Sequence, residues 1–169
     1  SCASCTTNNI SPIVEILGRT VGIQKAIMTT IHAYTASQSL MDSASPKNLR
    51  MGRAAADNLV PTSTGAAIAT TKALPEFVGK FDGVAVRVPV KVGSISDMTF
   101  VTKRPVSTEE INEILELEAR GERYREVLST TREALVSSDI IGSPYAAIVD
   151  LNMTRVVDGD LLKVMAWYD

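Results

Sequence analysis

Cys5 and His32 are the two residues of this chain whose types and spacing suggest covalent chemistry. His32 is the only histidine, and Cys5 is one of two cysteines. We predict a helix over residues 5–18 about 20 Å long and a strand over residues 25–32 about 23 Å long. Because the two lengths match, the strand would return the imidazole to the end of the unit that carries the thiol. A thiolate with an adjacent base is a typical activated nucleophile.

The same two residues also fit a structural role. Taken separately, Cys5 suits a small inert core position and His32 a hydrogen-bonded strand position. A free cysteine has a pKa of about 8.5, so the thiol needs a helix N-terminus or an imidazolium to react at neutral pH. The residues leave two helix starts open: near Cys5 with Pro12 as a kink, or at Pro12 after a Ser11 cap. Only the first start gives the thiol a helix N-terminus.

Cys2 and Cys5 together form a C-x-x-C sequence. Such a pair serves elsewhere as a redox dithiol or as half of a zinc site. Zinc would need further ligands, and His32 is the only nitrogen ligand available beside the carboxylates. A thioredoxin-like redox motif would follow a strand, which this sequence does not place there. We therefore expect no metal site and treat Cys2 as incidental.

Arg87, Thr64 and Gly65 are candidate anion-binding residues. Alternation along residues 84–90 places four valines on one face of a strand, and Arg87 with Ala85 on the other. The guanidinium is then either a solvated edge residue or a fixed anion clamp. Thr64 and Gly65 begin a predicted helix whose first N–H groups suit phosphate, although a plain N-cap is the commoner explanation.

The rest of the sequence predicts the elements that must position these residues. Residues 107–120 form the clearest helix, with Ser107 and Glu110 as a capping box. Residues 35–57 follow no period, and a loop of that length is usually functional. Further elements are a helix at 64–74 and strands at 23–34, 81–90, 93–103, 145–150, 154–157 and 161–167. We predict an α+β fold: a mostly antiparallel mixed sheet covered by helices on one face.

Composition is that of an ordinary globular domain. The chain has 169 residues, enough for one well-buried domain. A net charge of −2 gives no reason to expect nucleic acid or an acidic membrane surface as a partner, and no apolar run approaches the roughly 18 residues of a membrane span. Two cysteines are too few for a disulfide framework, which favours a reducing compartment. Residue 1 is not Met, so we expect a single domain, residues 1–169, excised from a longer protein.

Five stretches together resemble phosphorylating glyceraldehyde-3-phosphate dehydrogenase over the whole chain. In family order and spacing they are Ala3-Ser4-Cys5-Thr6-Thr7-Asn8, Thr30-Ile31-His32-Ala33-Tyr34-Thr35, Pro61-Thr62-Ser63-Thr64-Gly65-Ala66-Ala67, Arg87-Val88-Pro89 and Trp167-Tyr168-Asp169. The resemblance implies the catalytic domain of that enzyme, with the N-terminal dinucleotide-binding domain and the C-terminal helix absent from this chain. It also implies that residues 35–57 form a loop at the core of a tetramer.

The resemblance implies a role for each candidate residue. Cys5 would attack the aldehyde of glyceraldehyde 3-phosphate, and His32 would serve as the base. A thiohemiacetal and then a thioester would form, and inorganic phosphate would release 1,3-bisphosphoglycerate. Thr35 and Arg87 would bind the substrate phosphate. The other implied substrate- and phosphate-binding residues are Ser4 and, for the attacking phosphate, Thr6, Thr64 and Gly65.

The cofactor implied by the resemblance is NAD or NADP. Ser43 and Ala44 would border it. Strictly NAD-using relatives often carry Pro where Ala44 stands, so room for a ribose 2′-phosphate keeps NADP open. The full-length protein would be a cytoplasmic homotetramer.

Three residues depart from the family pattern. Cys2 stands where Asn is usual, Asn9 where a second Cys is common, and Ile68 where Lys is usual, which weakens the expected phosphate site. Cys2 could form an inhibitory disulfide with Cys5 under oxidation. Erythrose-4-phosphate dehydrogenase shares the nucleophile and base, but residues 63–67 argue against it. A non-catalytic assembly domain is the alternative from a different class.

Overall fold

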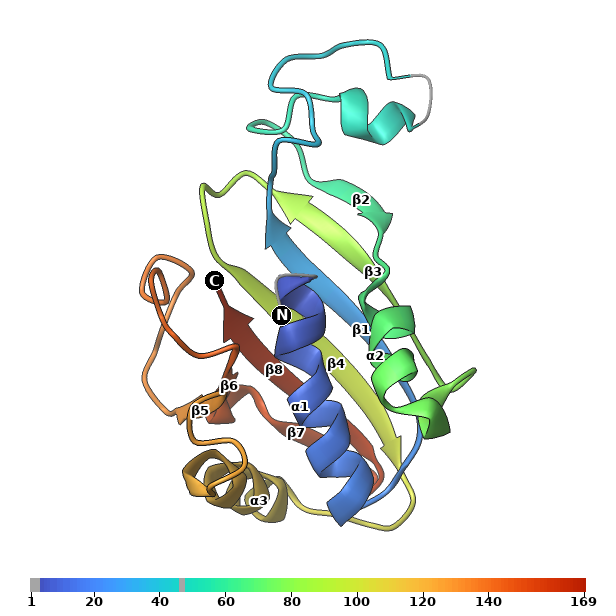
Figure 1. Cartoon of the computed structure of the whole chain (residues 1–169), viewed down its shortest axis with the longest axis vertical. Helices are drawn as coiled ribbons and strands as arrows, with labels where there is room; N and C mark the ends of the chain where they lie inside the picture. Colours follow the sequence, from blue (N-terminus) through green and yellow to red (C-terminus); the bar gives the residue numbers. More distant parts are fainter. Residues whose placement is uncertain (1–3, 46–47) are drawn as a thin grey trace.

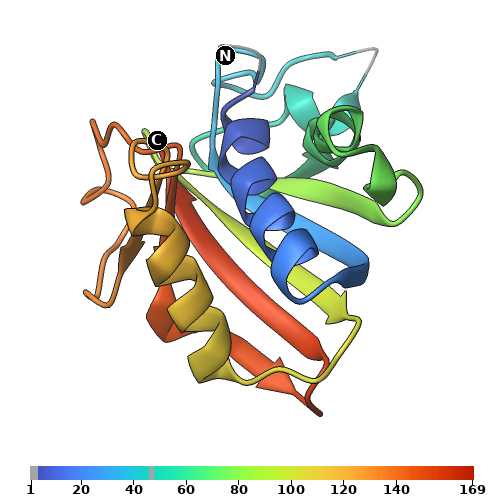
Figure 2. The ribbon, with the colours of Figure 1, turned by 60° about the horizontal axis from the view of Figure 1, so that its bottom comes forward.

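The structure is a computed structural model that describes residues 4–45 and 48–169. In this part of the chain, three α-helices lie on one face of a single mixed sheet (Figures 1 and 2). The helices are α1 (Cys5–Thr20), α2 (Ala66–Ala73) and α3 (Thr108–Arg120). The strands are β1 (Ile23–Ala33), β2 (Val60–Ser63), β3 (Phe81–Val88), β4 (Ser94–Thr102), β5 (Leu128–Thr131), β6 (Ala147–Asp150), β7 (Arg155–Val157) and β8 (Leu161–Tyr168). Short 3₁₀ helices occupy Leu49–Gly52, Pro75–Phe77 and Leu151–Met153.

The sheet has the strand order β2-β3-β1-β4-β8-β6-β5, and β7 pairs with β8. β1 runs parallel to β3, and β5 parallel to β6. The pairings of β1 with β4, β2 with β3, β4 with β8, β6 with β8 and β7 with β8 are antiparallel. The predicted α+β fold with a mostly antiparallel mixed sheet is therefore confirmed.

Helix α1 begins at Cys5 and not at Pro12. Ser4 is its N-cap, and the Ser4 hydroxyl accepts a hydrogen bond of 3.1 Å from the backbone N–H of Thr7. Such a cap satisfies one of the first backbone N–H groups, which have no partner inside the helix. Pro12 lies inside the helix. Of the two starts that the sequence left open, the structure has the one that puts the thiol at the helix N-terminus.

The hydrophobic core lies between the helices and the covered face of the sheet. Helix α1 supplies a buried stripe, and β4 and β8 supply every second residue. The buried side chains of this layer include Ile10, Ile13, Leu17, Met28, Met98, Phe100, Leu162 and Val164. Each large aliphatic side chain so buried stabilises the fold by about 1.5–3 kcal/mol. This packing fixes α1 on the sheet, and Cys5 with it.

Two edge strands were not predicted from the sequence. β2 is only four residues long and contains Pro61, which has no N–H for a sheet ladder. Such a residue is tolerated because β2 lies at one edge of the sheet. β5, at the other edge, is equally short and has the sequence Leu-Ser-Thr-Thr. Both strands are too short for alternation to distinguish them from loop.

The described residues 35–45 and 48–57 form an irregular loop, as predicted, and this loop projects beyond the end of the sheet (Figure 1). Backbone hydrogen bonds from Ser39 to Met51 and from Ala55 to Ser39 draw its two arms together. The loop carries the exposed apolar side chains of Leu40, Met41 and Leu49.

Candidate active site

Four neighbouring strands place one row of side chains at the N-terminal end of α1. In the sheet register Arg87 of β3 lies beside His32 of β1, His32 beside Ser94 of β4, and Ser94 beside Tyr168 of β8. Cys5 is the first residue of α1. The site is thus built from one helix start and the ends of four strands.

The thiol and the imidazole meet, as the matched element lengths predicted. Cys5 Sγ lies 3.5 Å from His32 Nε2, and Cys5 is exposed. The hydrogen bond with His32 is the largest influence on the pKa of Cys5, and the charge of His32 and hydrogen bonds from Thr6 act in the same direction. Partial burial opposes them, but the pKa of Cys5 is lowered overall. The site therefore favours the thiolate, the reactive form of cysteine.

The second ring nitrogen of His32, Nδ1, contacts Ala33 and Arg87. His32 Nδ1 lies 2.7 Å from the carbonyl oxygen of Ala33 and 2.5 Å from Arg87 Nη1. Arg87 Nη1 also donates to the same carbonyl at 3.0 Å. A carbonyl oxygen only accepts and would need a proton on Nδ1, whereas a guanidinium only donates and would need the lone pair of Nδ1, so these two contacts favour opposite tautomers. In either tautomer Nε2 is the ring nitrogen that faces the thiol and lies within reach for a proton transfer.

Tyr168 belongs to the site, although no role was predicted for it. Its hydroxyl lies 2.7 Å from Thr6 Oγ1 and 2.6 Å from Thr30 Oγ1. Its ring meets the imidazole of His32 edge to face, with centroids 6.0 Å apart at 67°. Burial raises the pKa of Tyr168, outweighing the effect of its hydrogen bonds with Thr30 and Thr6. The alternation of β8 was the available signal, because it puts Tyr168 on the covered face with Val164 and Ala166.

Arg87 presents one unused edge of its guanidinium. Nη1 is engaged with Ala33 and His32, whereas Nε is buried and has no hydrogen-bond partner. Guanidinium groups bind carboxylate and phosphate through two parallel N–H groups. Thr35 follows the end of β1, and its hydroxyl lies 2.9 Å from that of Ser37. The strand prediction for Arg87 is also met, since Ala85 on the same face is buried while Val84 is half exposed.

The structure assigns three predicted residues to helix starts. Ser4 caps α1 as described, Gly65 is the N-cap of α2, and the Thr64 hydroxyl accepts from the backbone N–H of Ala66 at 3.2 Å. Gly65 has no side chain that could cap the helix, and a Cβ atom at this position would have no other atom within 4 Å. The space beside Gly65 at the start of α2 is thus open.

Comparison with known proteins gives the family. The family model described as "Glyceraldehyde 3-phosphate dehydrogenase, C-terminal domain" matches residues 4–169. The chain belongs to this family. It is 46% identical over 167 residues to "Glyceraldehyde-3-phosphate dehydrogenase 2" of Streptomyces avermitilis and 48% identical over 167 residues to "Glyceraldehyde-3-phosphate dehydrogenase" of Haloarcula vallismortis. Each match covers 99% of this chain and 49% of the relative. The chain therefore spans about half the length of these relatives.

The five motifs of the sequence resembled glyceraldehyde-3-phosphate dehydrogenase, and the family match confirms that resemblance. Among the predicted site residues, the structure brings Cys5, His32 and Arg87 together with Thr6. Ser43 and Ala44 lie instead on the projecting loop, where the Ser43 N–H donates to Gly52. Cys2 lies outside the described residues, so a Cys2–Cys5 disulfide stays a prediction.

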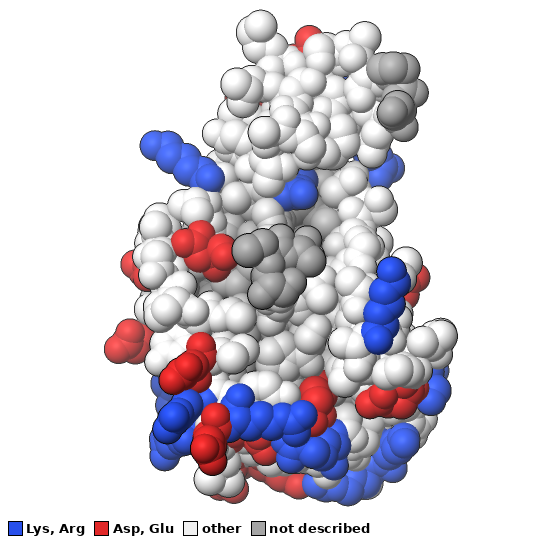
Figure 3. Space-filling view, viewed as in Figure 1, with Lys and Arg blue, Asp and Glu red and all other residues white. Residues whose placement is uncertain are grey.

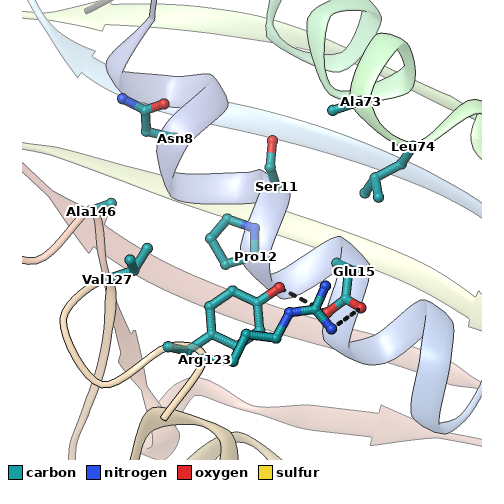
Figure 4. A pocket seen from close by; sticks show the side chains of 10 residues that line it. Asn8, Ser11, Pro12, Glu15, Ala73, Leu74, Arg123, Val127 and Ala146 are labelled. Atoms are coloured by element: carbon teal, nitrogen blue, oxygen red, sulfur yellow. Dashed lines mark hydrogen bonds and ion pairs between the residues drawn. The ribbon is translucent and has the colours of Figure 1, made fainter. Parts of the chain in front are cut away.

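A separate hollow of about 470 Å³ lies on the outer side of α1 (Figure 4). Its lining includes Glu15, whose carboxylate accepts from Tyr124 at 2.8 Å and pairs with Arg123 at 3.1 Å. These contacts tie α1 to the segment after α3. Lys and Arg side chains lie among Asp and Glu side chains at the bottom of the helix-covered face in Figure 3.

Within residues 4–45 and 48–169, no three His, Cys, Asp or Glu side chains are arranged to hold a metal ion. None of the helices in those ranges is both long and apolar enough to cross a membrane.

Proposed function

We propose that this chain is the catalytic domain of a phosphorylating glyceraldehyde-3-phosphate dehydrogenase. The whole protein would convert glyceraldehyde 3-phosphate, inorganic phosphate and NAD or NADP into 1,3-bisphosphoglycerate and the reduced cofactor. The observation that carries the proposal is the 3.5 Å contact between Cys5 Sγ and His32 Nε2 at the start of α1.

The first step uses the thiolate and the base. The sulfur of Cys5 attacks the aldehyde carbon, a C–S bond forms, and the carbonyl oxygen takes a proton from the imidazolium of His32. The product is a thiohemiacetal. Because Nε2 is the ring nitrogen that faces Cys5 Sγ, Nε2 gives and later takes this proton.

The second step removes the same proton and oxidises the carbon. His32 Nε2 takes the hydroxyl proton of the thiohemiacetal while the hydrogen on carbon leaves as hydride, and a thioester on Cys5 results. NAD or NADP, when bound, supplies the hydride acceptor. Ser43 and Ala44 are small and exposed, so they fit a ribose with or without a 2′-phosphate.

The third step releases the product. Inorganic phosphate attacks the thioester carbon, and Cys5 leaves as a thiolate whose charge the start of α1 stabilises. We assign the substrate phosphate to Arg87 and Thr35, because Arg87 Nε is buried and unpartnered. We assign the attacking phosphate to Thr6, Thr64 and Gly65, because the space beside Gly65 at the start of α2 is open and the Thr6 hydroxyl is held in place by a hydrogen bond with Tyr168. Ser4, the N-cap of α1, remains a substrate- or phosphate-binding residue of the proposal.

We also propose a homotetramer for the full-length protein, in the reducing environment of the cytoplasm. The face of the sheet opposite the helices, called the open face below, exposes the apolar side chains of Ile27, Val84 and Leu161. These side chains support assembly because they could pack against another subunit. The same observation supports the second candidate, a non-catalytic assembly domain whose thiol has no function.

Thiol reactivity separates the two candidates. If the proposal holds, iodoacetamide alkylates Cys5 at pH 7 faster than a free thiol of ordinary pKa, and His32→Asn slows the reaction. A Cys5 that reacts no faster than a free thiol favours the assembly domain.

The 169-residue chain alone should produce no NADH from glyceraldehyde 3-phosphate, because the dinucleotide-binding domain would lie outside it. In the full-length protein, steady-state rates with glyceraldehyde 3-phosphate and erythrose 4-phosphate decide between the two dehydrogenases.

A further inference from the structure

Two polar groups meet at Nδ1 of His32, and the hydrogen bonds among the three cannot all form at once. Arg87 Nη1 lies 2.5 Å from His32 Nδ1 and 3.0 Å from the carbonyl oxygen of Ala33, and this oxygen lies 2.7 Å from Nδ1. The bond from Arg87 to the carbonyl forms whichever ring nitrogen carries the proton. The other two contacts exclude each other, because Nδ1 of a neutral imidazole has either a proton or a lone pair. The position of one proton therefore decides which contact becomes a hydrogen bond.

The guanidinium of Arg87 favours the tautomer with the proton on Nε2. A hydrogen bond from a charged donor is about twice as strong as one between neutral groups. The Ala33 carbonyl loses little in this tautomer, because it still accepts from Arg87 Nη1. A proton on Nδ1 would instead bring two donors together at 2.5 Å. With Arg87 in this position, we expect an Nε2–H group to face the sulfur of Cys5, which lies 3.5 Å away.

The proposed reaction needs the opposite arrangement at both ring nitrogens. To act as a base, Nε2 must hold a lone pair, and the imidazolium formed when it takes a proton carries one on Nδ1 as well. Of the two groups that contact Nδ1 from Ala33 and Arg87, only the carbonyl oxygen can accept a hydrogen bond from it. The guanidinium must therefore leave Nδ1 before His32 works as the base.

An anion bound by Arg87 can drive this movement. Arg87 Nε is buried and has no hydrogen-bond partner, so the guanidinium keeps a donor that the described residues do not use. A phosphate group binds two parallel N–H groups of a guanidinium. Binding of the substrate phosphate, which we assign to Arg87, would give Nε a partner and draw the guanidinium away from the ring.

We propose that Arg87 is a positioning residue for the base: it keeps the proton of neutral His32 on Nε2 until a phosphate monoester draws the guanidinium away, and Nε2 then holds the lone pair. In this exchange Nε2 gives its proton to water and Nδ1 takes one from water, so the ring stays neutral. His32 becomes a base only when the substrate phosphate is bound. The inference rests on the proposed function, because it concerns the same base and the same phosphate site.

The chain has one histidine, so the ¹⁵N spectrum of histidine-labelled protein reports on His32 alone. A protonated ring nitrogen and a lone-pair nitrogen differ widely in ¹⁵N chemical shift. Within residues 4–45 and 48–169, Cys5 and Tyr168 also contact the ring. The spectra are recorded on the 169-residue chain with Cys5→Ser, so that no thiolate charge biases the ring, and at alkaline pH, which keeps an imidazole neutral.

The lone-pair signal should belong to Nδ1 in the chain that keeps Arg87. Arg87→Met should move it to Nε2 and change the tautomer ratio by roughly tenfold or more, the effect of one hydrogen bond from a charged donor. Saturating glycerol 3-phosphate, a phosphate monoester with no aldehyde, should move the signal in the same direction when Arg87 is present. The same ligand should change nothing in Arg87→Met.

Arg104→Met is the matched control for loss of an arginine. Arg104 follows β4 at the end opposite Ser94 and pairs with Glu110 at 2.6 Å. This variant, and glycerol in place of glycerol 3-phosphate, should leave the tautomer unchanged. A shift with either control as large as that of Arg87→Met would overturn the inference.

The remaining outcomes separate this inference from the proposed function. A ring that keeps its proton on the same nitrogen in Arg87→Met, or throughout the glycerol 3-phosphate titration, overturns the inference and leaves the nucleophile and base in place. A Cys5 that alkylates no faster than a free thiol in the unsubstituted chain contradicts the proposed function instead. If circular dichroism shows that Arg87→Met does not fold, the titration of the chain that keeps Arg87 decides.

Discussion

The two faces of the sheet are built by the same strands but carry different kinds of side chain. On the helix-covered face, β4 and β8 present Met98, Phe100 and Val164, all fully buried. On the open face the same strands present Asp97 and Lys163, paired at 2.7 Å, and the neighbouring β1 exposes Ile27.

The difference between the two faces indicates where reactive side chains can lie in this fold. The covered face is filled mainly by apolar packing, and the site lies at its rim, where α1 begins and the strands end. Cys5, His32, Arg87 and Tyr168 all lie at that rim. A packed core holds these side chains rigidly while the thiol stays exposed. Among the described residues, the open face brings no thiol, imidazole and guanidinium together in this way, and its exposed apolar residues suit contact with another chain.

Phe100→Ala tests the covered face and should have the largest effect on stability. Phe100 is fully buried between the helices and the sheet. We expect the free energy of unfolding to fall by about 3–5 kcal/mol, because the lost transfer energy adds to the cost of a cavity. Urea unfolding followed by circular dichroism measures it. A loss below about 1 kcal/mol would contradict a tightly packed covered face.

Glu15→Gln tests the ion cluster that ties α1 to the segment after α3. Burial alone would raise the pKa of Glu15, but the bonds with Tyr124, Arg19 and Arg123 lower it overall. A carboxyl whose pKa is lowered by folding stabilises the protein above its unfolded pKa, and loses that contribution as pH falls through the folded value. We expect Glu15→Gln to cost about 1–2 kcal/mol at pH 7 and progressively less as pH falls below about 4.3. Unfolding free energies at pH 7 and pH 3 test this, and an equal loss at both would contradict it.

Ser107→Ala tests the cap of α3. The Ser107 hydroxyl accepts from the backbone N–H of Glu110 at 3.1 Å. Its removal should cost about 1 kcal/mol. Ser107→Asp, which keeps an acceptor at the cap, is the control and should restore most of the loss.

Ile27→Ser tests the open face and should have the smallest effect on the chain alone. Ile27 is 59% exposed. A surface substitution of this kind changes the free energy of unfolding by less than about 0.5 kcal/mol. If the open face is an assembly surface, the same substitution should lower the association of the full-length protein in sedimentation experiments. A large loss of stability in the isolated chain would remove the distinction between the two faces.

Local signals predicted much of the fold and part of the site. The Ser107 cap and the apolar stripe of α3 are sequence-local, and α3 was predicted to within one residue. The lengths of α1 and β1 were enough to bring Cys5 to His32. The residues left the start of α1 open because Pro12 can either begin a helix after a Ser11 cap or lie inside a helix that begins near Cys5, and the packing of residues 10–17 on the sheet decides between the two.

Sequence by itself predicted the Cys5–His32 pair and the α+β class, because capping, periodicity and element lengths depend on neighbours within a few residues. Tertiary structure decided the row from Arg87 through His32 and Ser94 to Tyr168. That row depends on the register of four strands distant in sequence, one pairing parallel and two antiparallel, and register is fixed by long-range packing. For the same reason the hydroxyl of Tyr168, 162 residues from Thr6, could be recognised as part of the site only in the folded chain.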